Sequence, residues 1–333
     1  MSSPLAIPGW MAAESPFHAS ELEVQERVGV RATLDARVRR AGIRNYMPDQ
    51  HRQFFNELPF LLIGSTDAGG QPWATMQLGR PGFLTTPDSR TLHIAGASLP
   101  GNPLQGRLNT GAFIGALGIQ LTTRRRNRVN GVITIADHEG LTVAVRQSFG
   151  NCPKYIQRRE PCLIENNHHV TTDAAVTDAA QLSASDQTLI RRADTCFIAS
   201  ANLDPAASMA RGVDVSHKGG RPGFLRIDDD HTLTMPDFIG NSYFNTIGNL
   251  MHDPRAGLLF IDFELGDLLY LAADAEIIWE GPEVDTFTGA ERLVRFHVRK
   301  VRRTVNVLPI RWSPVQYAAE LTRTGTWQEP TGT

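Results

Sequence analysis

The hexapeptide Gly-Arg-Pro-Gly-Phe-Leu occurs twice in this chain, at residues 79–84 and again at residues 220–225. The two copies are 220 − 79 = 141 residues apart, and the same offset relates Leu92 to Leu233. Apolar runs upstream of both copies lead into turns that contain Gly, Asp or Pro. The period is too long for a solenoid repeat, whose units run ~20–50 residues. The ordered matches therefore predict one domain that is present twice.

Length and charge exclude several classes of partner. The 333 residues suggest about two domains at ~150 residues each. Because 33 basic side chains nearly balance 35 acidic ones, no overall field favours nucleic acid or an anionic membrane. No apolar run approaches the ~18 residues of a membrane span, and the start of the chain does not resemble a secretory signal. We expect a cytoplasmic protein whose partner is a small molecule or another protein.

The cysteines and histidines do not form a metal or disulfide pattern. Cys152, Cys162 and Cys196 are odd in number and contain no C-x-x-C pair, which argues against a disulfide framework or a four-thiolate iron–sulfur cluster. His168 and His169 lack ligand spacing to other His or Cys residues. We expect no metal site.

Short apolar segments between Gly, Pro and Asp turns favour a small antiparallel barrel over an alternating βα fold. No G-x-G-x-x-G after a strand and no P-loop motif occurs. After residue 285, alternation of apolar and charged residues predicts a long strand, although the sequence repeat fades there. The other expected strands are 60–65, 73–78, 82–85, 91–94, 112–117 and 129–135 in the first copy, and 197–201, 208–215, 223–227, 232–235, 256–261 and 268–278 in the second.

Helices and boundaries complete the expected organisation. Charged and apolar residues predict a surface helix over 20–41, interrupted near Gly29, and Pro48 suits the start of another. Ser183 to Asp186 can cap a helix that runs to about Ala193. The predicted division is an N-terminal helical segment at 1–46, a first barrel at 47–165, a linker at 166–184, a second barrel at 185–315 and a tail at 316–333.

The stretch 209–220 is the strongest candidate for a ligand site. On a strand, Arg211 shares one face with Val213, while Asp214 and Ser216 share the other. Ser216, His217 and Lys218 would then stand at the strand end, before two glycines. A hydroxyl, an ammonium group and exposed backbone N–H groups suit a phosphate or carboxylate. A polar strand end with a glycine turn is the alternative.

Three further stretches carry candidate groups. In 235–246, Gly240, Asn241 and Ser242 lie where a strand turns into a helix, so they either bind an anion or cap the helix. In 123–131, the expected loop is basic whereas its counterpart at 264–267 is acidic, so it either brings positive charge to one shared site or is a solvated hairpin.

The third stretch closes the first copy. Pro153 suits a helix start, which would turn Lys154 and Tyr155 either towards an adjoining site or into an interface. Cys152 is either a thiol nucleophile or a buried spectator.

Together these segments resemble the flavin-nucleotide-binding proteins related to pyridoxamine 5′-phosphate oxidase, from about residue 17 to 312. The resemblance is carried by FHASELEVQERVG, TRRRNRVNG, FGNCPKYIQRR, MARGVDVSHKGGRPGFLRIDDDHTLTMPDFIGNSYFNTIGNLMHDPRAGLLFI and VLPIRW. It implies six-stranded split β-barrels that bind FMN between two barrels, usually in a homodimer. Here the repeat would supply both barrels. We therefore expect a mainly β fold with flanking helices (α+β), in which two tandem antiparallel split β-barrels form an intrachain pseudo-dimer.

The resemblance also implies residue roles. By position, the FMN phosphate would be held by Arg211, Ser216, Lys218 and Asn241, and the flavin would be lined by Met235, Pro236 and Asp237. Asp214, His217 and Gly240 complete the expected set, and Arg124, Arg126 and Arg128 would approach from the other barrel. This chain has Ser242 where family members often have an arginine, and it lacks the pyridoxal-phosphate-binding motifs. Pyridoxamine phosphate is therefore not the expected substrate.

The expected function is an FMN-dependent oxidoreductase that acts on a small molecule. Electrons would come from a separate reductase, from NAD(P)H or from the substrate, and His217 and Tyr243 are the candidates for proton transfer. One alternative is a flavin-binding module without turnover. Another is a haem-handling split barrel with His217, His252 or His297 as ligand. The number of flavins per chain and a homodimer stay open.

Overall fold

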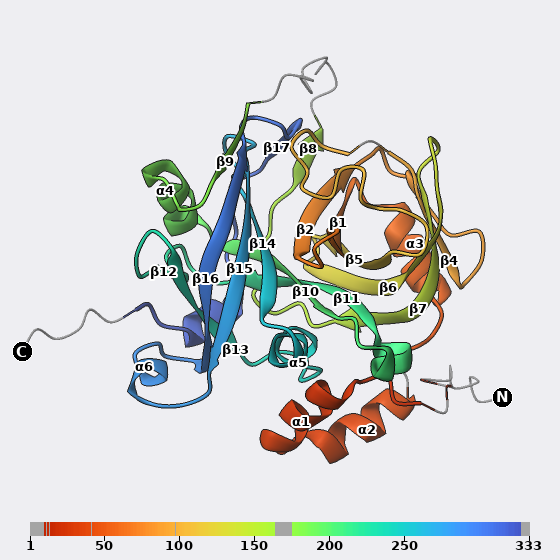
Figure 1. Cartoon of the computed structure of the whole chain (residues 1–333), viewed down its shortest axis with the longest axis horizontal. Coiled ribbons are helices and arrows are strands. Elements are labelled where there is room, and N and C mark those ends of the chain that lie inside the picture. The colour runs from red at the N-terminus through yellow and green to blue at the C-terminus, as the bar shows by residue number, and fades with distance from the viewer. Residues whose placement is uncertain are drawn as a thin grey trace, which may run out of the picture.

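Two antiparallel sheets with the same strand order lie side by side in the computed structural model, which describes residues 10, 12, 14–40, 42–96, 98–163 and 175–327 (Figure 1). The first sheet runs β2 (Pro72–Leu78), β1 (Phe60–Thr66), β5 (Phe113–Gln120), β6 (Arg125–Ala136), β7 (Leu141–Asn151), β4 (Thr91–Ile94), β3 (Leu84–Thr85). The second runs β11 (Gly212–Gly219), β10 (Thr195–Asn202), β14 (Arg255–Ile261), β15 (Leu268–Ile278), β16 (Ala290–Thr304), β13 (Thr232–Phe238), β12 (Arg226–Ile227). The predicted fold class, a pair of antiparallel split barrels, is confirmed.

The repeated hexapeptide makes the same turn in both halves. A Cβ atom on Gly79 would lie 2.2 Å from the Phe83 ring, and one on Gly220 would lie 2.4 Å from the Phe224 ring. Both turns need glycine because the aromatic ring folds back onto the first residue, where any side chain would collide with it.

The two halves pack through reciprocal contacts of strand on strand. A Cβ on Gly115 of β5 would lie 2.4 Å from the Val213 carbonyl oxygen of β11, and one on Gly257 of β14 would lie 2.2 Å from the Pro72 carbonyl oxygen of β2. Each half thus presses its β5-type strand against the β2-type strand of the other. This is the arrangement of a two-fold dimer, formed within one chain.

Three clusters of buried apolar residues explain the stability of this arrangement. One lies inside the first barrel and one inside the second. The third lies between them and takes Leu62 and Trp73 from the first half and Phe197 and Tyr270 from the second. β10 is buried along its whole length, and its central residues Cys196 to Ala199 are apolar without alternation.

The helices lie mostly where the sequence predicts them. α1 (Ala19–Arg27) and α2 (Arg31–Arg40) are separated at Gly29, which has φ of +72°, and they lie below the barrels in Figure 1. Ser183 caps α4 (Ala184–Arg192) as expected. The remaining helical elements are α3 (Asp49–Asn56), η1 (Pro205–Ala210), α5 (Asn245–His252), α6 (Pro282–Asp285) and η2 (Ala319–Arg323).

Several local predictions are wrong. The strand expected at 208–215 begins only at Gly212 and runs to Gly219, so Ser216 to Lys218 lie within the strand and not at its end. The basic stretch is not a loop, since the chain turns at 121–124 and Arg125 already belongs to β6. Residues 152–160 form no helix. At 125–128 pairing with β5 overrides the local turn signal, whereas 205–210 form η1 and β11 begins only where Gly212 pairs with Asn202.

The ends of the two halves also differ from expectation. β16 takes the place in its sheet that β7 takes in the first, so the structural repeat continues where the sequence repeat fades. Residues 164–174, which include 166–174 of the expected linker with His168 and His169, lie outside the described residues. β9 (Val176–Ala179) pairs with β16. β8 (Pro161–Leu163) pairs with β17 (Ile310–Trp312). Within the described chain, no helix has the length and apolarity needed to cross a membrane.

Candidate functional site

A pocket lies between the two halves of the molecule, with about 870 Å³ of space free of protein atoms when its open mouth is included. The first half contributes the strand β6, the end of β7 and the segment after it. The second half contributes β11, β13 and the turn that leads into α5. The residues that line it are Leu117, Arg126, Arg128, Asn151, Cys152, Lys154, Tyr155, Ser216, His217, Lys218, Gly219, Phe224, Pro236, Asp237, Phe238, Gly240, Asn241, Ser242, Phe244, Asn245, Thr246 and Ile247.

Arg128 crosses from the first half to the second. Its Nη1 donates to Asp214 Oδ1 at 2.8 Å and to Asn245 Oδ1 at 3.1 Å, and its Nη2 donates to Ser216 Oγ at 2.6 Å. Both members of the Arg128–Asp214 ion pair are buried, and removal of either would leave an uncompensated charge. This network joins the two halves at the floor of the pocket.

Arg126 lies two residues before Arg128 on β6, and therefore on the same face of the strand. Its Nε donates to the Cys152 carbonyl oxygen at 2.8 Å, and its Nη1 lies 3.2 Å from His217 Nδ1. Burial lowers the pKa of Arg126, but a guanidinium stays protonated in proteins. No carboxylate among the described residues forms an ion pair with it. Arg126 is a half-buried cation without a counter-charge among the described residues.

His217 is neutral in this setting. Burial, followed by the charges of Arg126 and Lys218, lowers the pKa of His217 well below its usual value. Because Nδ1 faces the N–H groups of Arg126, it accepts, and the ring proton is assigned to Nε2. Nε2 is buried and has no partner in the described structure.

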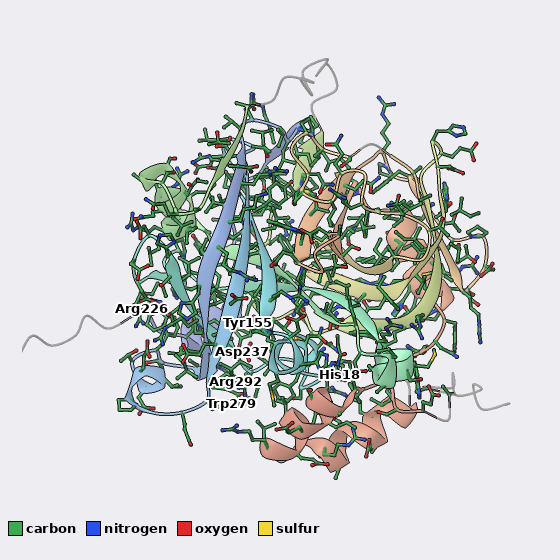
Figure 2. The ribbon with its side chains drawn as sticks, viewed as in Figure 1. His18, Tyr155, Arg226, Asp237, Trp279 and Arg292 are labelled. Atoms are coloured by element: carbon green, nitrogen blue, oxygen red, sulfur yellow. The ribbon has the colours of Figure 1, made fainter. Side chains whose placement is uncertain are left out.

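Lys218 and Arg292 share the carboxylate of Asp237. Lys218 Nζ donates to Oδ1 and Arg292 Nη1 to Oδ2, each at 2.6 Å. Burial alone would raise the pKa of Asp237, but the two cations lower it. Figure 2 shows Asp237 and Arg292 next to each other, below Tyr155. The strand β13 shifts register after Asp237, and such irregularities often occur beside binding sites.

The charges around the pocket do not balance. Four cations line it: Arg126, Arg128, Lys154 and Lys218. Two carboxylates compensate them, Asp237 and the Asp214 that contacts Arg128. The net charge of these six side chains is 4 − 2 = +2. Arg292 does not change this sum, because its own charge is balanced by Glu291. Lys154 has no ion pair with any described residue. Low-dielectric surroundings strengthen this excess, so the pocket favours an anion.

Three buried N–H donors of lining residues lack an acceptor in the part of the chain that is described. They are Arg128 Nε, Asn151 Nδ2 and His217 Nε2. A buried donor without an acceptor costs about 1–3 kcal/mol. A ligand rich in oxygen and nitrogen acceptors would remove that cost.

Aromatic side chains form one wall of the pocket. The rings of Tyr155 and Phe238 lie 5.0 Å apart between centroids, with an interplanar angle of 34°. The segment that carries Tyr155 approaches β11 closely, because a Cβ on Gly219 would lie 2.1 Å from the Tyr155 carbonyl oxygen. Glycine at 219 therefore lets the first half close over the second half's strand.

Glu21 and His18, on and before α1, lie behind the pocket. Glu21 Oε1 accepts from Asn245 Nδ2 at 2.5 Å, and Oε2 accepts from the His18 backbone N–H at 3.0 Å. Burial, then the charge of Asp214, raises the pKa of Glu21 to about 8. Sequence reasoning missed this carboxyl because Glu21 is one of many charged residues on an apparently exposed helix.

Most of the sequence-predicted residues meet at this pocket. Ser216, His217, Lys218, Pro236, Asp237, Gly240, Asn241, Arg126 and Arg128 line it, and Asp214 contacts Arg128 from behind. Lys154, Tyr155 and Cys152 also line it, although not from a helix. Asn151, Phe238 and Asn245 were not singled out in the sequence, because a lone asparagine or phenylalanine carries no distinctive local signal.

Three predicted cofactor residues lie elsewhere. Arg211 precedes β11; its Nε donates to the Leu203 carbonyl oxygen at 2.8 Å and its guanidinium stacks on Phe113. Arg124 sits in the turn before β6, where its Nε donates to the Ile156 carbonyl oxygen at 2.9 Å. Met235 is fully buried in the core of the second barrel. Arg124 and Arg211 lie just before β6 and β11, so the alternation of side chains along those strands does not place them in the pocket.

The candidate for proton transfer, Tyr243, also lies outside the pocket lining. Its ring packs against Phe17 and Phe149, and burial raises the pKa of its hydroxyl. His297 is exposed on β16, and neither it nor His252 lines the pocket. In the described ranges, no group of three or more His, Cys, Asp or Glu residues is placed to hold a metal ion.

Comparison with known proteins gives structural likenesses only. No protein-family model matches the chain. No curated protein sequence matches it either. HupZ from Group A Streptococcus is 17% identical, with 35% of this chain and 90% of HupZ covered and a TM-score of 0.28. A putative pyridoxamine 5′-phosphate oxidase from Lactobacillus delbrueckii is 14% identical, covering 37% and 94%, at 0.28. An FMN-binding protein from Syntrophomonas wolfei is 14% identical, covering 35% and 86%, at 0.26.

Proposed function

We propose that this chain binds FMN in the pocket between its two barrels and acts as an FMN-dependent oxidoreductase on a small molecule. The observation that carries the proposal is the combination of excess positive charge, three unpartnered buried N–H donors and an aromatic wall in one pocket. The excess positive charge suits a phosphate, and the unpartnered N–H donors suit the nitrogen and oxygen acceptors at the edge of a flavin ring. The aromatic wall suits a planar ring system that packs against it. Ligand sites commonly combine such groups.

Different side chains of the pocket would bind different parts of FMN. Arg126 and Lys154 have no carboxylate partner, so they would hold the phosphate together with Lys218 and the Ser216 hydroxyl. Tyr155 and Phe238 would pack against the rings and exclude water. His217, which is neutral and protonated on Nε2, would donate a hydrogen bond. When bound, the flavin supplies hydride or electron transfer, and the protein orients it. Electrons would come from NAD(P)H or a separate reductase.

The geometry around His217 favours a flavin over haem. A histidine that binds a metal usually donates its other ring N–H to a carboxylate or a carbonyl. Here Nδ1 faces the cationic Arg126 instead, which makes the imidazole a weaker electron donor. The other two histidines considered as haem ligands do not line this pocket.

We also infer that the two halves arose by internal duplication. The identical strand order and the hexapeptide turn with the same glycine contact support this. Because both barrels belong to one chain, the pocket is complete without a homodimer.

The first test compares two arginines that lie two residues apart. Arg126→Ala removes a half-buried cation of the pocket and should weaken FMN binding by about 10- to 100-fold, as expected for one or two charge-assisted hydrogen bonds. Arg124→Ala removes a cation that points away and should change the dissociation constant by less than about two-fold. Quenching of flavin fluorescence measures both. Equal effects, or no binding by the unaltered chain, would contradict the proposed site.

The second test separates an oxidoreductase from a flavin-binding module. The FMN-loaded chain is mixed with NADPH, NADH or a flavin reductase without oxygen, and the flavin absorbance is followed. We expect bleaching with at least one donor. A bound flavin that no donor reduces would favour the module.

A further inference from the structure

The two-fold relation between the barrels defines a second position, equivalent to the pocket, and strand pairing identifies its residues. In the first half, one row across the sheet runs through Met76, Leu62, Leu117 and Arg128. In the second half, the row with the same pairings runs through His217, Phe197, Leu259 and Tyr270. Met76 and His217 differ by 141 residues, the spacing of the hexapeptides. Tyr270 therefore stands where Arg128 stands in the first half.

The same pairings give the counterpart of each polar group. Arg126 corresponds to Leu268, Arg128 to Tyr270, Ser216 to Thr75, His217 to Met76, Lys218 to Gln77 and Asp237 to Gly96. The charged residues Arg126, Arg128, Lys218 and Asp237 are thus replaced by neutral residues at the second position. An anion placed there would meet none of the cations that hold it in the pocket.

The second position is also filled. Met76, Leu268 and Tyr270 are fully buried in the cluster that joins the two barrels. Burial raises the pKa of the Tyr270 hydroxyl, so it stays neutral. Gln77 Nε2 donates to the Gly96 carbonyl oxygen at 2.9 Å, where the pocket has its pair of Lys218 and Asp237.

The turn above the second position is pressed onto its neighbour. A Cβ on Gly101 would lie 2.1 Å from Thr304 Cγ2 on β16. Gly101 corresponds to Gly240, where the nearest atom to such a Cβ is 3.9 Å away. The turn at Gly240 therefore leaves room over the pocket, whereas the equivalent turn at Gly101 closes over the second position.

A hollow does lie outside this sealed position. Asp67, Trp73, Asn102, Arg107 and Lys300 are among the residues that line it, and none of Thr75, Met76, Gln77, Leu268 and Tyr270 is. Its Arg302 pairs with Asp178 at 2.6 Å. The hollow thus borders Trp73 and the Gly101 turn, but the residues that fill the second position do not line it.

We propose that each chain binds one FMN and that the second, symmetry-related position has become part of the core between the barrels. The proposal rests on the proposed function. A symmetric dimer must keep both sites because one sequence forms them, whereas a tandem chain can keep one site and fill the other with apolar side chains. The filled site adds to the packing between barrels, and the open one binds the ligand.

Stoichiometry tests this proposal. The flavin-free chain, with its concentration fixed by amino-acid analysis, is titrated with FMN in an isothermal calorimeter. We expect one FMN per chain in one step. Lys218→Gln introduces the residue found at the second position and should weaken the whole binding step at least about 10-fold. Arg107→Ala, in the outer hollow, should leave stoichiometry and affinity unchanged within about two-fold.

Each other outcome overturns a different claim. Two FMN per chain, or half of the binding kept in Lys218→Gln, would overturn the single site but leave flavin binding standing. Loss of binding in Arg107→Ala would place the ligand in the outer hollow and overturn the proposal as well. No binding by the unaltered chain would overturn the proposed function and this inference together.

Discussion

At the scale of single residues, the Glu21 carboxyl links pH to stability. Its pKa is raised from 4.5 to about 8, first by burial and then by Asp214, so the folded chain holds this proton more tightly than the unfolded chain does. The free energy of unfolding from this group therefore falls as pH rises from about 4.5 to about 8, by at most ~1.4 kcal/mol per pH unit.

Glu21→Gln should remove this dependence, because the amide does not ionise. Urea unfolding of both proteins between about pH 5 and pH 8.5 should show the variant gaining stability relative to the original as pH rises. Parallel curves over this range would mean that Glu21 is already ionised in the folded chain.

Gly219 is the residue on which the closure of the pocket depends. Gly219→Ala places a methyl group 2.1 Å from the Tyr155 carbonyl oxygen and 3.0 Å from His217 Cε1. We expect a loss of about 1–3 kcal/mol in unfolding free energy and weaker FMN binding, because the segment at 152–157 must move away. Gly212→Ala on the same strand is the control, since its nearest neighbour is 3.8 Å away. Similar losses in both variants would refute the role of this close approach.

At the scale of elements, α1 docks on α5 through a contact that requires glycine. A Cβ on Gly248 would lie 2.6 Å from Glu21 Cγ and 2.9 Å from Glu21 Cα. His18 Nε2 bonds to Asn249 Oδ1 at 2.9 Å beside it. α5 also contributes Asn245 and Thr246 to the pocket. Because α1 packs on α5, α1 supports the floor of the site.

Gly248→Ala should lower stability although alanine is the better helix former. Helix propensity alone would stabilise the variant by about 1 kcal/mol. The clash with Glu21 should outweigh this by about 1–3 kcal/mol and expose α1 to proteases. Thermal unfolding measures the loss of stability, and limited proteolysis measures the exposure of α1. A rise in melting temperature would show that α1 does not pack tightly against Gly248.

At the scale of the whole molecule, the core between the barrels should make the two halves unfold together. This cluster draws side chains from both sheets, and the strand contacts at Gly115 and Gly257 are reciprocal. Scanning calorimetry should give one transition whose calorimetric and van't Hoff enthalpies agree. Gly115→Ala and Gly257→Ala should each lower that single transition, because each adds a clash across the same interface. Two separate transitions, with one variant shifting only one of them, would mean that the barrels are independent.

Sequence patterns alone predict the paired architecture and many element positions correctly. The hexapeptide repeat, the break at Gly29, the cap at Ser183 and the strand at 268–278 are local signals, because they depend on backbone conformation and on neighbours a few residues away. These features persist in the structure for the same local reasons. The candidate residues Ser216 to Lys218 were also visible as polar groups before two glycines, and Arg124 to Arg128 as a basic run whose counterpart is acidic.

The tertiary structure determines which of these groups face one another. Arg126 and Arg128 lie two residues apart on β6 and point into the pocket, whereas Arg124 lies in the turn before the strand, with φ of +57°, and points away. Glu21 becomes a buried acid only when α1 packs on α5. The difference between the open pocket and the sealed position follows from cross-strand register, which joins residues more than a hundred positions apart. Such pairings depend on partners that no local pattern specifies.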